Sequence, residues 1–337
     1  MRMTGRRWLA AFLIFAAGTL SGCKRTEAPA DPISRSAFLL NTFVTVTLYD
    51  SQDEAVLEGS LDLCRQYEEL LSTTIDTSEV SRINHRSPDE TAVTVSQETA
   101  ELIRKGLEYG ERTEGAFDIT IQPVSSLWDF TSGQAKLPAP ELLKEAAQKV
   151  DYRNVHVEGS QVILDSPDTA IDLGAIAKGY IADRIKDYLL ENGVNSATIN
   201  LGGNVLCVGS RPDGTPFKIG LQMPFADRNE TIAALNIDGL SVVTSGVYER
   251  HFELDGVNYH HLLNPEDGYP YQNGLLSVTI VSPLSVDGDA LSTSCFSLGL
   301  EKGMELAESM DGVYAYFITD DYEIHYSEGA RELISES

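Results

Sequence analysis

The sequence contains few cysteines and few basic residues for its acidic content, and both shortages narrow the range of functions. Only four of its 337 residues are cysteine, and no two of them form a Cys-x-x-Cys pair. A disulfide framework, dithiol redox chemistry and a zinc site of the usual spacing are therefore not expected. The 25 Lys and Arg residues are outnumbered by 51 Asp and Glu, which gives a formal net charge of −26 at pH 7. This charge disfavours nucleic acid and anionic lipid as partners.

Long apolar runs are also missing after the N-terminus. Three arginines lie within the first seven residues, followed by the apolar segment 8–20 and by Leu20-Ser21-Gly22 ahead of Cys23. This run is too short for a comfortable membrane span but suits the core of a signal peptide. We therefore expect residues 1–22 to be a lipoprotein signal peptide and Cys23 to be the lipidated N-terminus of an exported, membrane-anchored protein. The alternative is an N-terminal anchor helix with an incidental cysteine.

The rest of the chain predicts a tether followed by one domain. Residues 23–34 are polar and contain proline, as is typical of a tether, and residues 35–337 show no internal linker. Strands that come in runs, with helices grouped separately, favour an α+β fold over a doubly wound parallel sheet. Apolar periodicity predicts helices over 53–71, 97–113, 140–150, 175–190 and 287–300, and strands over 44–48, 155–157, 162–164, 313–318 and 322–326, with further strands between 196 and 281.

One candidate anion site lies at a predicted helix start. Asp172 stands between apolar residues and precedes Gly174, and Lys178 follows one turn into the helix. Helix N-termini present free N–H groups and the positive end of a dipole, which suits phosphate. Lys178 could reach the same anion. The alternative is that Asp172 only caps the helix and Lys178 faces solvent.

A candidate metal site lies on the predicted helix 287–300. Asp289 and Thr293 are four residues apart and share one helix face. A carboxylate and a hydroxyl are hard oxygen ligands of the kind that Mg²⁺ takes together with phosphates. An anionic ligand of so acidic a chain needs such a cation or local N–H groups to hold it. Alternatively, Asp289 caps the helix and Thr293 bonds back to a carbonyl.

Further segments are weaker signals. Residues 115–120 combine a glycine helix stop with an acid, while 200–204 and 244–246 with Tyr248 contain glycines that allow close backbone approach or simply turn the chain. His261 lies three residues before an Asn-Pro turn. It is the most plausible general base in the chain because histidine titrates near neutral pH, although it could also only brace the loop.

Taken together and in this order, the segments resemble the ApbE-type flavin transferase family. The resemblance covers roughly residues 38–300. The matching pieces are Leu40-Asn41-Thr42, Ser78-Glu79-Val80-Ser81-Arg82-Ile83-Asn84, Gly115-Ala116-Phe117-Asp118 with Thr120 and Pro123, Ile171-Asp172-Leu173-Gly174-Ala175 with Lys178-Gly179, Asn200-Leu201-Gly202-Gly203, Thr244-Ser245-Gly246 with Tyr248, His261-Leu262-Leu263-Asn264-Pro265, and Asp289-Ala290 with Thr293.

The resemblance implies a fold, an activity and a set of site residues. The fold would be T-fold-like, and the activity would be that of a Mg²⁺-dependent FAD:protein FMN transferase. FAD would be the substrate, AMP would leave, and the acceptor would be a threonine of a membrane-associated flavoprotein. FAD contacts would come from Leu40, Ala116, Phe117, Asp118, Asp172, Lys178 and Leu263, and Mg²⁺ ligands from the carbonyl of Ala175 and the side chains of Asp289 and Thr293. His261 would take the proton of the acceptor hydroxyl.

Two departures from the family pattern leave alternatives open. Leu40-Asn41 stands where the family often has Met-Gly, and Thr74, which the resemblance also places at the FAD site, stands where many members have a tyrosine. The second change removes a stacking surface for a ring of FAD. A Mg²⁺-dependent FAD pyrophosphatase and a non-catalytic FAD-binding lipoprotein therefore remain alternatives. A solute-binding lipoprotein of the transport kind fits least, because a two-lobed α/β pattern is absent.

Overall fold

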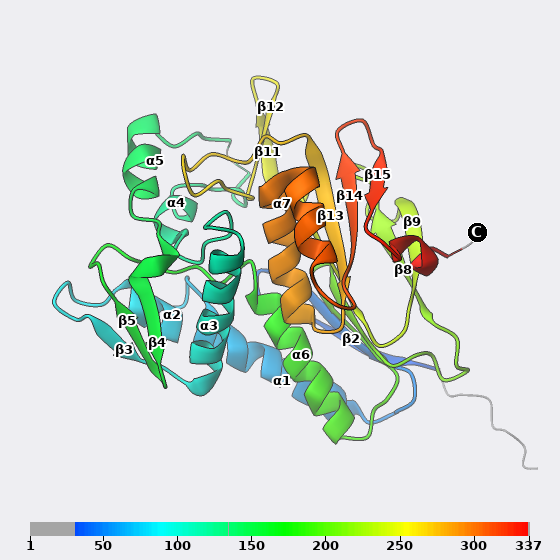
Figure 1. The fold of residues 1–337 in the computed structure, drawn as a ribbon. Coiled ribbons are helices and arrows are strands. Elements are labelled where there is room, and N and C mark those ends of the chain that lie inside the picture. The colour runs from blue at the N-terminus through cyan, green and yellow to red at the C-terminus, as the bar shows by residue number, and fades with distance from the viewer. Residues whose placement is uncertain (1–30, 134, 336–337) are drawn as a thin grey trace, which may run out of the picture.

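The computed structural model describes residues 31–133 and 135–335, and its main element is an antiparallel sheet of eight strands (Figure 1). The strand order is β1-β2-β6-β7-β10-β13-β14-β15, with every neighbouring pair antiparallel. The bounds are β1 Ile33–Leu39, β2 Thr42–Leu48, β6 Ala197–Leu201, β7 Asn204–Val208, β10 Ser241–Gly246, β13 Leu275–Ser282, β14 Tyr314–Thr319 and β15 Ile324–Tyr326.

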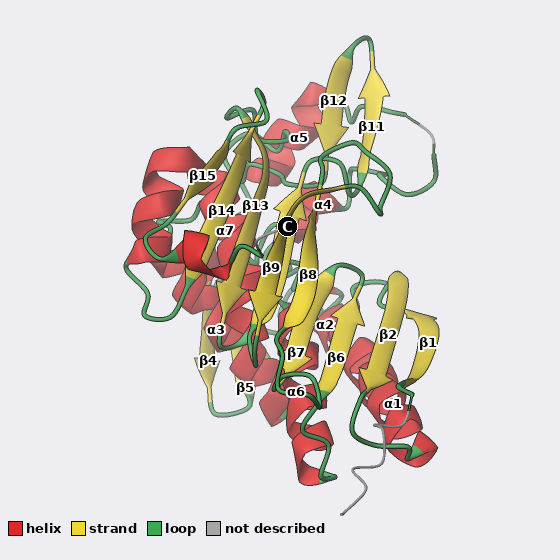
Figure 2. Ribbon diagram, turned by 90° about the vertical axis from the view of Figure 1, so that its right-hand side faces the viewer, coloured by secondary structure: helices red, strands yellow, loops and turns green. Residues whose placement is uncertain are grey.

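Three long helices cover one face of this sheet, and a hairpin packs on the other. The helices are α1 (Glu54–Leu71), α6 (Ala177–Glu191) and α7 (Ser285–Glu308). Helix α6 contacts both α1 and α7, and the three helices pack on strands β2, β7, β10 and β13. The hairpin of β8 (Phe217–Gln222) and β9 (Thr231–Ile237) lies over the opposite face, where a second apolar cluster forms (Figure 2). This arrangement confirms the predicted α+β class.

Smaller elements complete the fold, most of them on the side of α3 away from the large sheet, while η2 packs on β9 and β14. They are α2 Glu79–Asn84, α3 Gln97–Arg112, α4 Gln122–Ser125, α5 Pro140–Ala147, the sheet of β3 Ala92–Thr94, β5 Gln161–Leu164 and β4 Val155–Glu158, the hairpin of β11 His251–Leu254 and β12 Val257–His260, and the short helices η1 Tyr152–Asn154 and η2 Ala330–Leu333. The β11–β12 hairpin stands at one end of the molecule, close to α4 and α5 (Figure 1). An aromatic cluster of Trp128, Phe130, Phe252, Tyr259 and Tyr269 joins these pieces.

The sequence pattern explains the packing of the first elements. In β2, the alternating residues Val44, Val46 and Leu48 are fully buried against the helices, as the predicted strand requires. Helix α1 begins after Asp53, whose side chain accepts a hydrogen bond of 2.9 Å from the N–H of Ala55. The apolar stripe of α1 then packs on the sheet.

The three described cysteines are free and buried, as expected for thiols that pack as small apolar groups. They come from α1 (Cys64), β7 (Cys207) and α7 (Cys295), three elements far apart in the sequence. Burial raises the pKa of each thiol to about 12. Each therefore stays protonated at neutral pH and is a poor nucleophile.

Several element ends differ from the predictions. Helix α6 begins two residues later than expected, at Ala177, and α5 ends three residues early, at Ala147. Helix α7 continues past the predicted end to Glu308, through a non-helical Gly299 at φ 79°. Strand β1 begins at Ile33, two residues before the expected start of the domain.

The predicted signal peptide and the lipidation site at Cys23 lie outside the described residues, so both stay predictions. Within the part of the chain that the structure describes, no helix combines the length and the apolar character that a membrane span requires.

Candidate functional site

The N-terminus of α6 and the first turns of α7 meet at a buried carboxylate. Asp289 of α7 is 4% exposed, and its Oδ2 accepts a hydrogen bond of 2.9 Å from the backbone N–H of Gly179. Its Oδ1 lies 3.4 Å from Nζ of Lys178. The predicted anion site and the predicted metal site are therefore one place. The N–H of Gly179 and the ammonium of Lys178, both in α6, face the acid of α7, while the N–H groups of Ala177 and Tyr180 donate to carbonyls of residues 173 and 176.

Oxygen donors surround this junction. The hydroxyl of Thr293, one turn after Asp289, lies 3.1 Å from the hydroxyl of Ser245 at the end of β10. The carbonyl of Ala175, just before α6, accepts no hydrogen bond from any described residue. A carbonyl with a free lone pair, a buried carboxylate and a hydroxyl form a set of hard oxygen donors, which fits Mg²⁺. The described residues contain no group of three or more His, Cys, Asp and Glu placed to hold a metal, so such an ion would depend on backbone and hydroxyl oxygens.

Neither capping alternative for this site agrees with the structure. Asp289 is the fifth residue of α7 and bonds to α6 instead of capping its own helix. Thr293 bonds to Ser245 of the sheet. Helix α6 has no side-chain cap, because Asp172 accepts instead from the N–H of Gly174, at 2.9 Å.

Helix α7 is held in place from two sides. The carboxylate of Asp183 in α6 accepts from the backbone N–H groups of Ser285 and Val286, both at 2.9 Å, and so caps α7 from another helix. Asp287 accepts a hydrogen bond of 2.7 Å from the hydroxyl of Tyr109 in α3. Asp183 lies inside a predicted helix, and no sequence signal pointed to this role.

The loop with Asp172 is braced by the segment 78–84. The side chain of Asn84 donates to the carbonyl of Ile171 and accepts from its N–H, at 2.8 and 2.7 Å. Ser78 caps α2, and Glu79 accepts from the N–H and the hydroxyl of Ser96 at the start of α3. These bonds give this matching segment a supporting structural role.

The segment with Ala116, Phe117 and Asp118 is also largely tied up inside the protein. The carboxylate of Asp118 is buried and accepts from the N–H and the hydroxyl of Thr120 and from the N–H of Tyr152. Burial raises the pKa of Asp118, while these hydrogen bonds oppose the rise. Phe117 is buried, and the carbonyl of Ala116 accepts from the hydroxyl of Tyr271. The expected contact of these three residues with FAD stays a prediction.

Leu40, in the turn after β1, and Thr74, in the loop after α1, both lie near the C-terminal end of α1. Leu40 and Asn41 form the β1–β2 turn, both at φ 54°, a conformation that glycine and asparagine adopt most readily. Asn41 therefore suits the position where the family often has glycine. The N–H of Leu40 donates to Glu68 of α1, at 2.7 Å. Thr74 is exposed in the loop after α1, where a larger side chain has room.

His261 follows β12 and is half-buried. Its Nδ1 lies 3.3 Å from the carbonyl of Arg250. Because a carbonyl only accepts, Nδ1 carries the proton of this bond, and Nε2 keeps a free lone pair. Burial lowers the pKa of His261 to about 3, and the charges of Arg250 and Lys178 act in the same direction. His261 is therefore neutral at physiological pH and able to accept a proton.

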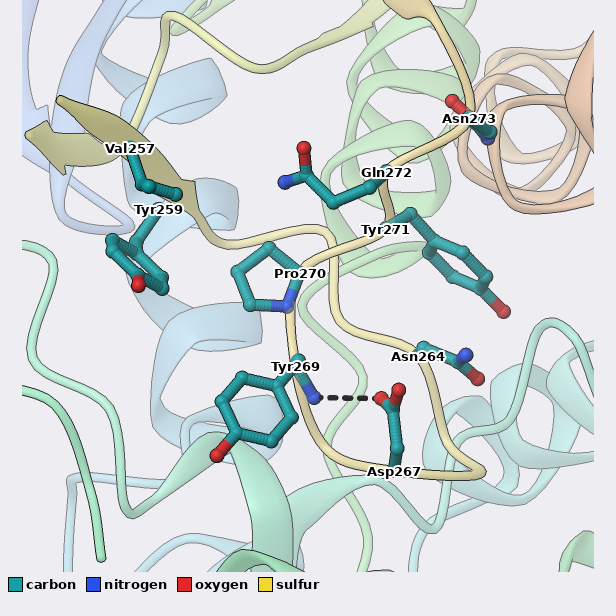
Figure 3. A pocket seen from close by; sticks show the side chains of 9 residues that line it. All are labelled: Val257, Tyr259, Asn264, Asp267, Tyr269, Pro270, Tyr271, Gln272 and Asn273. Carbon is teal, nitrogen blue, oxygen red and sulfur yellow. Dashed lines mark hydrogen bonds between the residues drawn. The ribbon is translucent and has the colours of Figure 1, made fainter. Parts of the chain in front are cut away.

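The structure brings some predicted residues together and leaves others apart. Lys178 of α6 contacts Asp289 of α7, Thr293 lies one turn further along α7, and Asp172 and Ala175 lie in the loop that leads into α6. Leu263 pairs with Pro270 and packs on the aromatic cluster. A cavity of about 520 Å³ opens beside this segment, between β12 and residues 264–273 (Figure 3). None of the predicted site residues is among those that line it.

Comparison with known proteins agrees with this arrangement. The profile of the ApbE family matches residues 40–317. A FAD:protein FMN transferase of Klebsiella pneumoniae is 39% identical over 88% of this chain and 92% of its own length, and one of Treponema pallidum is 33% identical over 88% and 87%. The crystal structure of an ApbE protein from Thermotoga maritima superposes with a TM-score of 0.82 at 31% identity, covering 90% of this chain and all of that one. The flavin transferase ApbE of Vibrio cholerae gives 0.81 at 26%, with the same coverage.

A profile match over most of the chain and relatives above 30% identity over nearly their whole length establish the relationship. The structural matches extend it from the sequence to the fold, which has the ApbE type that the resemblance implied. This chain belongs to the ApbE family.

Proposed function

We propose that this protein is a Mg²⁺-dependent FAD:protein FMN transferase. The observation that carries the proposal is the α6–α7 junction, where Asp289, Thr293 and the free carbonyl of Ala175 lie beside Lys178. Cleavage of a pyrophosphate needs oxygen donors for a metal next to a cation that holds phosphate. Relatives up to 39% identical are named FAD:protein FMN transferases.

In the reaction, the hydroxyl oxygen of the acceptor attacks the phosphorus of the FMN half of FAD. A P–O bond to the acceptor forms, the pyrophosphate bond breaks, and AMP leaves with the bridging oxygen. The proton of the hydroxyl passes to Nε2 of His261, which the geometry leaves free. Lys178, through its ammonium and its backbone N–H at the start of α6, binds the phosphates, and Asp172 holds the loop before it.

Mg²⁺ would be held by the carbonyl of Ala175, the carboxylate of Asp289 and the hydroxyl of Thr293. It would supply positive charge that compensates both the pyrophosphate and the acidic chain. Asp289→Asn keeps the shape of the side chain and an oxygen for the N–H of Gly179. The substitution should therefore weaken Mg²⁺ binding in calorimetry while the far-UV circular dichroism spectrum stays unchanged. Equal Mg²⁺ affinity in both proteins would refute this ligand.

The acceptor in this proposal is a threonine of a membrane-associated flavoprotein, and the enzyme reaches it from a lipid anchor at Cys23. The arginine-rich start, the short apolar run and the Leu-Ser-Gly-Cys sequence support export and lipidation. Cys23→Ala should abolish incorporation of labelled palmitate and release the protein from membranes. Labelling of that variant at the level of the unchanged protein would contradict the anchor.

In the decisive experiment, the enzyme is incubated with FAD, Mg²⁺ and membranes from cells of the source organism in which the gene of the enzyme has been deleted. A flavin-fluorescent protein band on a denaturing gel, formed together with AMP, is the expected result. Free FMN and AMP without a band would indicate the pyrophosphatase. FAD that stays bound and uncleaved would indicate the non-catalytic FAD-binding lipoprotein. Omission of Mg²⁺ controls for the metal.

A further inference from the structure

A cavity of different chemistry lies next to the α6–α7 junction. It opens between β12 and the segment 264–273, and Val257, Tyr259, Tyr269, Pro270 and Gln272 form much of its wall (Figure 3). No lysine, arginine or histidine is among its lining residues, while one carboxylate, that of Asp267, is. Because nothing in the wall balances a phosphate, the cavity is unsuited to the pyrophosphate of FAD and to AMP.

The groups that face this cavity suit a polypeptide. The amide of Gln272 and the hydroxyls of Tyr259 and Tyr269 form no hydrogen bond with any described residue. Gln272 and Val257 point toward one another across the opening (Figure 3), and Val257 is 42% exposed. An amide offers both a donor and an acceptor to a peptide backbone. Tyrosine rings and small apolar surfaces are typical of protein-binding patches.

The wall of the cavity is also bonded to the parts that carry the proposed chemistry. The hydroxyl of Tyr271 donates to the carbonyl of Ala116, at 3.1 Å. The side chain of Asn273 donates to the carbonyl of Phe296, one turn beyond Thr293 in α7. Strand β12 ends directly before His261. The cavity wall therefore continues directly into the segment that carries the proposed base.

We propose that this cavity binds an extended segment of the acceptor polypeptide, an inference that rests on the proposed transferase function. The backbone of the segment bonds to the amide of Gln272, and a short apolar side chain packs on Val257 and Pro270. The segment carries no acidic side chain at this point, because Asp267 lines the cavity and exposed Glu266 stands next to it. The acceptor hydroxyl lies on the side of His261.

The test compares two variants of the cavity with a matched control. Val257→Asp places a second carboxylate at the opening, and Gln272→Ala removes the unpartnered amide. Leu142→Asp makes the same kind of change at another exposed apolar residue, 51% exposed on α5, which does not line the cavity. Each protein is given FAD, Mg²⁺ and increasing amounts of membranes from source cells that lack its gene. Flavin fluorescence in the gel gives the initial rate of labelling.

The expected result is that the membrane amount giving half-maximal labelling rises about tenfold for Val257→Asp and severalfold for Gln272→Ala. The control should behave as the unchanged enzyme, and all four proteins should bind FAD equally and release FMN equally without membranes. If the membrane amount that gives half-maximal labelling is unchanged in both cavity variants, the proposal is overturned. Weaker FAD binding by these variants would also overturn it, since the cavity would then belong to the FAD site. If the unchanged enzyme labels no protein while it cleaves FAD, the transferase function itself fails, and the acceptor site fails with it.

Discussion

The backbone N–H of Gly179 donates a hydrogen bond of 2.9 Å to the carboxylate of Asp289, and this bond joins two helices at the centre of the candidate site. The contact is close because Gly179 has no side chain. A Cβ at this position would lie 2.2 Å from the carbonyl oxygen of Ser285 and 2.7 Å from Cα of Val286. Both atoms belong to the backbone of α7, which cannot move aside as a side chain can.

Gly179→Ala should therefore separate α6 from α7. We expect a loss of about 1–3 kcal/mol in the free energy of unfolding, the usual cost of overpacking, measured by urea denaturation. Displacement of the N–H of Gly179 should also leave the carboxylate of Asp289 less firmly held, so that Mg²⁺ binds less tightly in calorimetry. Asp289→Asn is the matched control, because it removes the charge and leaves the helices in contact. Wild-type stability and Mg²⁺ affinity in Gly179→Ala would show that the contact is not required.

The same contact shows what could be predicted from the sequence. The spacing of Asp289 and Thr293 predicted their common helix face, and the helix start after Gly174 predicted the N–H groups that face them. Their meeting could not be predicted, since it joins residues 110 positions apart, and residue periodicity describes only local structure. Asp118 is a second example: the hydrogen bonds that its oxygens accept from Thr120 and from the more distant Tyr152 could not be read from the local pattern.

The secondary structure shows the same difference between local features, which could be predicted, and long-range contacts, which could not. Helices α1 and α3 were predicted to within a residue or two, because each combines an apolar stripe with an Asp or Ser cap. Strand β1 was not predicted, because its consecutive polar residues Ser34, Arg35 and Ser36 interrupt the apolar alternation and follow a proline. Only its pairing with β2, through the turn at Leu40, makes this segment a strand.

The cap that Asp183 provides for α7 should make stability depend on pH. Burial raises the pKa of Asp183 to about 6, although two backbone hydrogen bonds oppose the rise. The folded protein therefore binds this proton more tightly than the unfolded chain. The resulting stabilisation is full below the unfolded pKa of 3.8 and is lost as the pH rises through about 6.

Asp183→Asn removes this titration. From pH 4 to pH 7, the free energy of unfolding of the wild type should fall relative to that of the variant by on the order of 2 kcal/mol. Urea denaturation at four pH values measures the difference, and subtraction of the variant cancels the other titrating groups. A difference that is constant or that grows in favour of the wild type with pH would contradict the raised pKa.

His261→Ala should slow transfer by about 100-fold or more if His261 is the base. The low pKa of about 3 means that its protonation limits the wild-type rate only in strong acid, so this residue should contribute no change between pH 5 and pH 8. Added imidazole should restore part of the rate of the variant. The neighbouring His260 is only 2% exposed, so a substrate hydroxyl has no access to its ring. His260→Phe, the control, should keep most activity. Equal losses without imidazole rescue would remove His261 from the mechanism.

Thr74 decides how firmly FAD is held and therefore how well transfer competes with hydrolysis. It is exposed in the loop after α1, its hydroxyl 3.1 Å from that of Ser72, so a tyrosine fits there without disturbing the core. A stacked aromatic ring adds roughly 1 kcal/mol, which is about a fivefold gain in affinity. Thr74→Tyr should therefore lower the Kd for FAD about fivefold in a fluorescence titration and reduce the slow release of FMN that we expect without acceptor. Thr73→Tyr, one position away, is the control and should change neither quantity.

Identical effects of both substitutions would mean that the ring acts nonspecifically. A wild type that releases FMN equally fast with and without acceptor membranes, and never labels a protein, would replace the transferase with the pyrophosphatase.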